Sequence, residues 1–99
     1  MLLHLLAHSR TGDKGNIVTI SLIAFRKDDF PLLEQRVTEE RVAAHFSPLI
    51  EGPVERYALP QLGALNFVLH RPIANSVTRS LALDAHGKCL GSALLALEI

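Results

Sequence analysis

The chain has 99 residues, 48% of them hydrophobic, and its ten acidic and ten basic residues give a formal net charge of +0. This length suits one domain over residues 1–99, and the balanced charge argues against nucleic acid or a membrane surface as a partner. No apolar run is long enough to span a membrane, and the N-terminus lacks the basic segment of a signal peptide. Cys89 is the only cysteine, so no internal disulfide can form. We therefore expect a cytoplasmic protein.

The first quarter of the chain predicts a β-hairpin. Residues 1–7 and 16–25 alternate along their length as strands do, and the second segment is rich in β-branched residues. Between them, residues 8–16 combine two glycines with short hydrogen-bonding side chains, which favours a shaped loop. We expect this loop to join an antiparallel pair that carries apolar residues on both faces.

The same loop is the best candidate for a binding site. Its amides could point into one concavity, and Arg10 and Lys14 would add positive charge for a phosphate or carboxylate. The alternative is a tight connection whose polar groups satisfy only their own backbone. The candidate ligand-binding residues are Ser9, Arg10, Thr11, Gly12, Asp13, Lys14, Gly15, Asn16, Asn66 and Arg79.

Helical signals follow the second strand. Asp28 or Asp29 can cap a helix that begins near Phe30-Pro31, since proline is tolerated in a first turn. Thr38 is placed to cap a second helical segment that ends before Pro48. We expect one bent helix or two short ones.

The second half of the chain predicts three more strands and one more helix. Residues 54–59 alternate as a strand, and leucines at helical spacing predict a short helix over residues 62–70, where a strand would fit nearly as well. Residues 77–83 and 88–99 are predicted to pair around a turn at residues 84–87. The whole is an α+β protein with about five mainly antiparallel strands in the order β-β-α-β-α-β-β.

No catalytic or metal-binding constellation emerges from the sequence. His4 and His8, if both lie on one extended strand, would be about 13 Å apart, too far to share an ion. A nucleophile at Ser9 or Thr11 would need a base, and the nearest candidate is His8. On a strand, His8 would project to the face opposite Ser9 and Thr11, which argues against a nucleophile–base pair. We therefore expect no catalytic residue, no metal and no cofactor, and no catalysis by the domain on its own.

Five blocks, in order along the chain, resemble the small C-terminal domain of AtuA-like (acyclic terpene utilisation) proteins. The resemblance implies a ferredoxin-like α+β sandwich with its helices on one face of the sheet. It also implies a free-standing copy of a domain that usually follows a much larger one, in a system linked to acyclic terpene degradation and acyl-CoA metabolism. The blocks are residues 10–16, 38–42, 54–57, 64–69 and 79–88.

The leading functional hypothesis is a non-catalytic accessory or assembly domain. Strands that are apolar on both faces, with two short helices as cover, favour packing against a second copy or a larger AtuA-like subunit. The alternative is a module that binds an anionic small molecule, a phosphate or an acyl-CoA, through residues 9–16. An enzyme in its own right is the third hypothesis.

Overall fold

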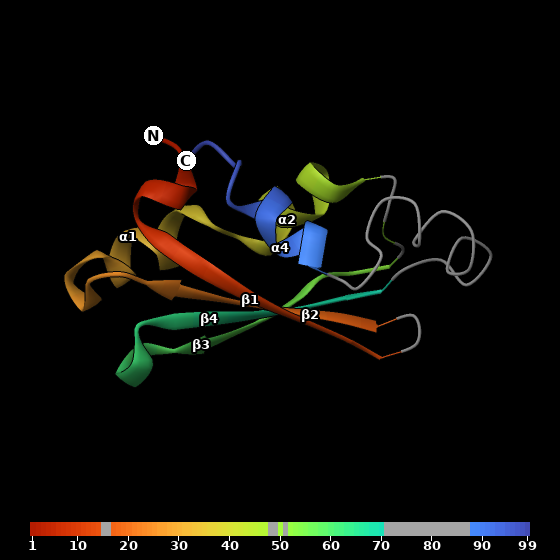
Figure 1. The fold of residues 1–99 in the computed structure, drawn as a ribbon, viewed down its shortest axis with the longest axis horizontal. Coiled ribbons are helices and arrows are strands. Elements are labelled where there is room, and N and C mark those ends of the chain that lie inside the picture. Colours follow the sequence, from red (N-terminus) through yellow and green to blue (C-terminus); the bar gives the residue numbers. More distant parts are fainter. Residues whose placement is uncertain (15–16, 48–49, 51, 71–87) are drawn as a thin grey trace.

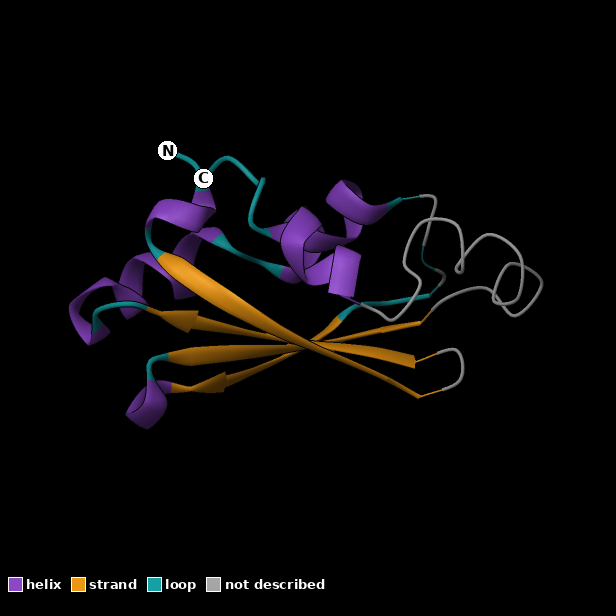
Figure 2. Cartoon of the chain, viewed as in Figure 1, coloured by secondary structure: helices purple, strands orange, loops and turns teal. Residues whose placement is uncertain are grey.

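A computed structural model describes residues 1–14, 17–47, 50, 52–70 and 88–99. One antiparallel sheet has helices stacked on one side of it (Figure 1, Figure 2). The predicted α+β class is confirmed, with four strands among the described residues where about five were expected. In chain order the elements are η1 (Leu3–Leu5), β1 (Ala7–Lys14), β2 (Ile17–Ala24), η2 (Lys27–Asp29), α1 (Phe30–Arg36), α2 (Glu39–Phe46), β3 (Glu55–Leu59), η3 (Pro60–Leu62), β4 (Ala64–His70) and α4 (Lys88–Leu94).

β1 and β2 form the predicted hairpin, with all eight residues of each strand paired in register. The loop predicted over residues 8–16 is wrong for residues 8–14, which belong to β1. Their turn-forming tendency is outweighed by pairing with β2, whose β-branched alternation makes it a strong strand. Gly12 does not adopt a positive φ, so the strand does not use its conformational freedom.

The strand predicted over residues 1–7 is wrong, because the 3-10 turn η1 occupies its middle. The C-terminal segment supplies hydrogen bonds that hold the first residues in place. The N–H of Leu3 donates to the carbonyl of Leu97 at 2.9 Å, and the N–H of Ile99 donates to the carbonyl of Met1 at 2.9 Å. The two termini therefore lie side by side (Figure 1).

Residues 30–46 form two separate helices, one of the two arrangements that the sequence allows. Pro31 stands in the first turn of α1, as predicted. Asp29 occupies the N-cap position, but its side chain makes no capping hydrogen bond. The predicted Thr38 cap of α2 is confirmed, since its Oγ1 accepts the backbone N–H of Arg41 at 3.3 Å.

The helix predicted over residues 62–70 is wrong, because β4 fills the position between β2 and β3. Leucine spacing alone is ambiguous here, since Leu65, Phe67 and Leu69 also alternate and are all fully buried. Pairing on both sides decides the outcome. Gly63, at φ 62°, ends η3 in the left-handed conformation and leads the chain into β4.

The strand predicted from Lys88 onward is wrong over α4. α4 packs against β1, and this tertiary contact outweighs the alternating pattern of the segment. Gly91 permits the close approach, because a Cβ there would overlap Oγ1 of Thr11. The predicted strand 77–83 and turn 84–87 lie outside the described residues. Across the part of the chain that the structure describes, no helix is both long and apolar enough to cross a membrane.

Among the described residues, the helices cover one face of the sheet and leave the other face uncovered. In β2, Val18, Ile20 and Leu22 are fully buried, whereas the residues between them are exposed or half-buried. The expectation that both faces are apolar is therefore only partly right, because the uncovered face mixes apolar and polar side chains. The core joins the covered face to the helices through Leu3, Ala7, Val18, Ile20, Leu22, Ala24, Phe30, Leu33, Val37, Val42, Phe46, Val54, Leu65, Phe67, Leu69 and Leu94.

Candidate functional site

The residues that point away from the helices include three rows that run across all four strands of the sheet. Strand register fixes which residues share a row, because directly opposed residues of an antiparallel pair lie on the same face. We call these twelve residues the open face. The central row is Arg10, Ser21, Asn66 and Tyr57, and the flanking rows are Gly12, Thr19, Val68 and Glu55, and His8, Ile23, Ala64 and Leu59.

The centre of the open face is polar. Oγ of Ser21 donates a hydrogen bond to Oδ1 of Asn66 at 2.7 Å, from β2 to β4. This bond leaves the N–H donors of the Asn66 amide and the lone pairs of the Ser21 hydroxyl without a partner among the described residues. Arg10 is exposed at the β1 end of the same row and has no ion-pair partner within the described part of the chain.

The β3 edge of the open face carries an acidic group. The hydroxyl of Tyr57 donates to Oε1 of Glu55 at 2.5 Å, and Nε2 of His70 lies 3.5 Å from Oε2 of the same carboxylate. These hydrogen bonds, from Tyr57 first and from His70 second, lower the pKa of Glu55 below its ordinary value of 4.5. The same contact raises the pKa of Tyr57, because Glu55 accepts its proton in a hydrogen bond and its charge opposes ionisation. Glu55 is therefore a fixed negative charge at neutral pH.

Apolar side chains surround the polar centre. Tyr57 is 51% exposed, and Leu62 of η3, next to the open face, is 65% exposed. Leu62 borders a shallow hollow of about 350 Å³ whose other lining residues are Ser21, Ile23, Leu59, Ala64 and Asn66. The hollow is broad and open rather than an enclosed cleft, which suits contact with another surface better than capture of a small molecule.

The residues predicted to bind a ligand do not form one cluster. β1 alternates, so Arg10 and Gly12 lie on the open face. Ser9 and Thr11 are half-buried on the other face, where their hydroxyls lie next to Gly91 of α4. Over the described residues 9–14 the backbone is an extended strand, so the predicted concavity of amides is not formed there.

The structure does bring two of the predicted residues into one row. Arg10 and Asn66 lie on either side of Ser21, two strand spacings or about 10 Å apart. Asp13 and Lys14 are the last residues of β1. Gly15, Asn16 and Arg79 lie outside the described residues.

The four described histidines, His4, His8, His45 and His70, are not brought together with other potential metal ligands. The ring of His8 stacks on Phe25, with centroids 5.5 Å apart and 21° between the ring planes. This places His8 on the face opposite Ser9, as the strand geometry predicts. His4 lies in η1, so the separation estimated for an extended strand does not apply to it. Within the described ranges, no group of three or more potential metal ligands comes together.

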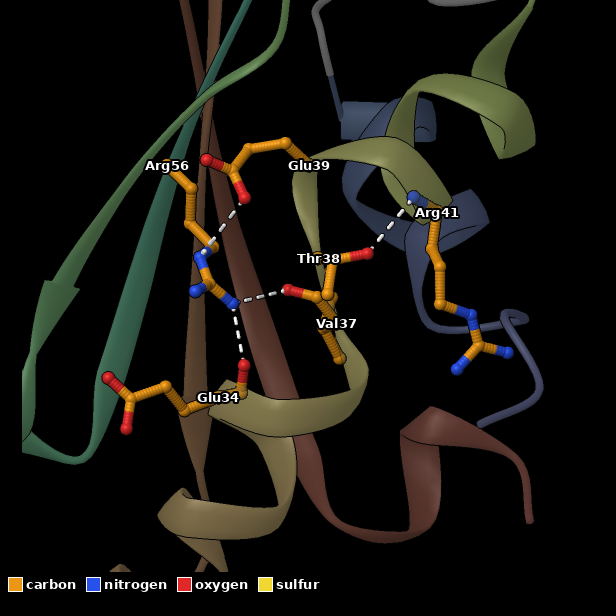
Figure 3. A network of polar contacts seen from close by, with 6 residues as sticks. All are labelled: Glu34, Val37, Thr38, Glu39, Arg41 and Arg56. Carbon is orange, nitrogen blue, oxygen red and sulfur yellow. Dashed lines mark hydrogen bonds and ion pairs between the residues drawn. The ribbon is translucent and has the colours of Figure 1, made fainter.

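A separate polar network lies on the covered side of the sheet (Figure 3). Nη1 of Arg56, on β3, donates to the carbonyls of Glu34 at 2.7 Å and Val37 at 2.9 Å, and Nε lies 3.7 Å from Oε1 of Glu39. The carbonyls belong to the C-terminal turn of α1, whose last carbonyls have no partner within the helix. Arg56 thus fastens the α1–α2 junction to the sheet, which is a structural role.

The comparisons with known proteins agree with this architecture. The model of the AtuA ferredoxin-like domain family matches residues 1–99, the whole chain. The chain belongs to this family. The ferredoxin-like fold that the sequence resemblance implies is thereby confirmed for this AtuA ferredoxin-like domain. A search of curated proteins and a search of solved structures each gave no match.

Sequence reasoning missed most of the open face of the AtuA ferredoxin-like domain. Alternation in residues 54–59 places Glu55 and Tyr57 on one face, opposite Arg56, and this signal was available. The partnership of Ser21 with Asn66 was hidden, because a helix was predicted where β4 pairs with β2. A residue's neighbour in the next strand cannot be inferred until both strands are recognised.

Proposed function

We propose that this AtuA ferredoxin-like domain is a non-catalytic accessory domain that assembles an AtuA-like system through its open face. The observation that carries the proposal is one-sided cover of the sheet. α1, α2 and α4 lie on one side (Figure 2), while Tyr57 is exposed and Ile23, Leu59 and Val68 are half-buried on the other. Apolar side chains on an uncovered sheet face are typical of association surfaces. The family resemblance links that system to acyclic terpene and acyl-CoA metabolism.

The polar groups of the open face also fit association better than catalysis. Ser21 is bonded to Asn66, and Tyr57 is bonded to Glu55, on a shallow surface that does not exclude water. General acid–base and nucleophilic catalysis need a base within hydrogen-bonding distance of a reactive group. The hydroxyls of Ser9 and Thr11 lie on the opposite face from His8. These arrangements support an accessory role.

Binding to a larger AtuA-like subunit, prepared without its own ferredoxin-like domain, tests the proposal. Calorimetry with the wild-type domain is expected to detect binding, and Ile23→Asp is expected to weaken it at least tenfold by burying a charge at the interface. Ala44→Asp, a change of similar kind at an exposed position on α2, serves as the matched control and is expected to bind as the wild type does. Equal binding by the two variants, or none by the wild type, would contradict the proposal.

The second candidate function is binding of an anion, a phosphate or an acyl-CoA. It is favoured by exposed Arg10, which lies in one row with Asn66. Because charged hydrogen bonds to an anion are strong while exposed charges add little to stability, Arg10→Ala and Lys14→Ala should weaken binding and leave folding intact. Calorimetry with coenzyme A, acyl-CoA and inorganic phosphate measures this, with Arg26→Ala as a control at a remote exposed site. No binding at millimolar concentration would exclude this function.

A further inference from the structure

We infer that the open face binds the open face of a second copy of this chain. The two copies are related by a two-fold axis that lies in the interface between them, parallel to the strands and above the line midway between β2 and β4. The inference rests on the proposed function and names the partner of the same surface. In such an arrangement both subunits contribute the same surface, and every contact occurs twice, which is the usual geometry of a homodimer.

The first observation is that the open face carries opposite charges at opposite edges. Arg10 is exposed on β1, which is one edge of the sheet. Glu55 lies on β3, at the other edge, where Tyr57 and His70 hold its carboxylate. No salt bridge among the described residues involves Arg10, which is exposed.

The second observation is that, of the two axes aligned with the sheet, only the axis along the strands makes these charges complementary. An axis parallel to the strands places β1 of one copy over β3 of the other, so that Arg10 lies above Tyr57 of the partner subunit, with Glu55 of the partner subunit one row away. A long arginine side chain spans that diagonal and can also contact the aromatic ring. An axis across the strands instead stacks β1 on β1 and brings like charges together, which is unfavourable.

The same axis matches the polar centre to itself. Ser21 of one copy lies over Asn66 of the partner subunit, and the reverse pair forms on the other side of the axis. The unused amide donors of Asn66 can then bond to the unused hydroxyl lone pairs of Ser21 across the interface. Ser21 and Asn66 would therefore keep hydrogen-bond partners when the surrounding apolar side chains are buried. This avoids the free-energy cost of burying polar groups without partners.

The size of the surface sets the expected strength. Four strands at about 4.8 Å spacing and six residues at about 3.3 Å give a face of about 19 by 20 Å. A small face of this kind fits the low end of interface sizes, where association is weak. We therefore expect a dimer with a dissociation constant in the micromolar range, populated in concentrated solution.

Charge reversal tests the arrangement through sedimentation equilibrium of the full chain between about 10 and 300 µM. The wild type is expected to approach the dimer mass at the upper end. Arg10→Glu alone and Glu55→Arg alone each create two like-charge contacts per dimer and are expected to weaken association at least tenfold. Mixing the two variants in equal amounts is expected to restore it, because each contact in the mixed dimer then joins opposite charges.

Two controls make the result specific. Glu34→Arg reverses a charge on α1, where only the backbone carbonyl of Glu34 contacts Arg56, and is expected to leave the mass unchanged. Thermal melts check that every variant folds. A monomeric wild type at 300 µM, or single variants that associate as strongly as the wild type, would overturn the inference. A monomer that still binds a larger AtuA-like subunit would overturn the homodimer alone and leave the proposed function standing.

Discussion

Two arginines on opposite faces of the sheet have different surroundings and therefore different roles. Arg56 is only 20% exposed at its side chain and donates to two carbonyls at the end of α1. Arg10 is exposed and has no ion-pair partner among the described residues. A charged group that is hydrogen-bonded to a helix end of its own chain stabilises the fold. An exposed charge without a partner adds little to stability and acts mainly on binding.

Arg56→Met is expected to destabilise the domain by about 1–3 kcal/mol, because it leaves helix-end carbonyls without donors. Urea unfolding at low protein concentration measures the change in the free energy of unfolding. Arg10→Met, the same substitution on the open face, is the control and should stay within about 0.5 kcal/mol of the wild type. Equal costs for the two substitutions would contradict the structural role assigned to Arg56.

Tyr57→Phe is expected to raise the pKa of Glu55 toward 4.5, because it removes the largest of the hydrogen bonds that lower it. A carboxyl group whose pKa is lowered by folding stabilises the native state above its unfolded-state pKa, and this contribution is lost as the pH falls through its folded-state pKa. A carbon-13 NMR titration of the Glu55 carboxyl group measures the midpoint directly. A wild-type midpoint at or above 4.5 would show that the hydrogen bond is not formed in solution.

At the scale of whole elements, the sequence predicted best where local signals suffice. β2, α1, α2 and β3 follow from alternation, from Pro31 in a first turn and from the Thr38 cap. The errors share one cause, which is that tertiary pairing outweighed local preference. Glycines and short polar side chains predicted a loop in β1, leucine spacing predicted a helix in β4, and alternation predicted a strand in α4.

The candidate site was predictable to the same limited extent. Arg10 and Asn66 were selected from the sequence, and they do share a row of the open face. Ser9 and Thr11 were selected for the same site but lie beneath α4, because a strand sends successive side chains to opposite faces. Face assignment therefore depended on recognising β1 as a strand.

The packing of α4 on β1 depends on Gly91. Gly91→Ala places a Cβ 3.0 Å from Oγ of Ser9 and into overlap with Oγ1 of Thr11, so it is expected to destabilise the domain by about 1–3 kcal/mol. In a Thr11→Ala background that overlap is absent, and the same change should be neutral or stabilising, because alanine favours a helix by about 1 kcal/mol over glycine. Thermal melts of the wild type, the two single variants and the double variant measure both effects of Gly91→Ala. The same effect of Gly91→Ala in both backgrounds would contradict the contact.

At the scale of the whole molecule, the fold divides the sheet into a structural face and an open face. The helices and the paired termini contribute the core and lie on one side (Figure 1). The other side combines apolar side chains with a hydrogen-bonded centre and with opposite charges at its two edges. This division is the basis of our proposal that the domain associates through the open face.

Amide chemical shifts recorded over a dilution series test that assignment most directly. As the protein concentration rises toward the millimolar range, signals of the central row, including Ser21, Asn66 and Tyr57, are expected to move together along one binding curve. Signals of Val42 and Phe46, buried between α2 and the sheet, are expected to stay fixed. Shifts concentrated on α1 and α2, or a spectrum that does not change over the whole series, would contradict association through the open face.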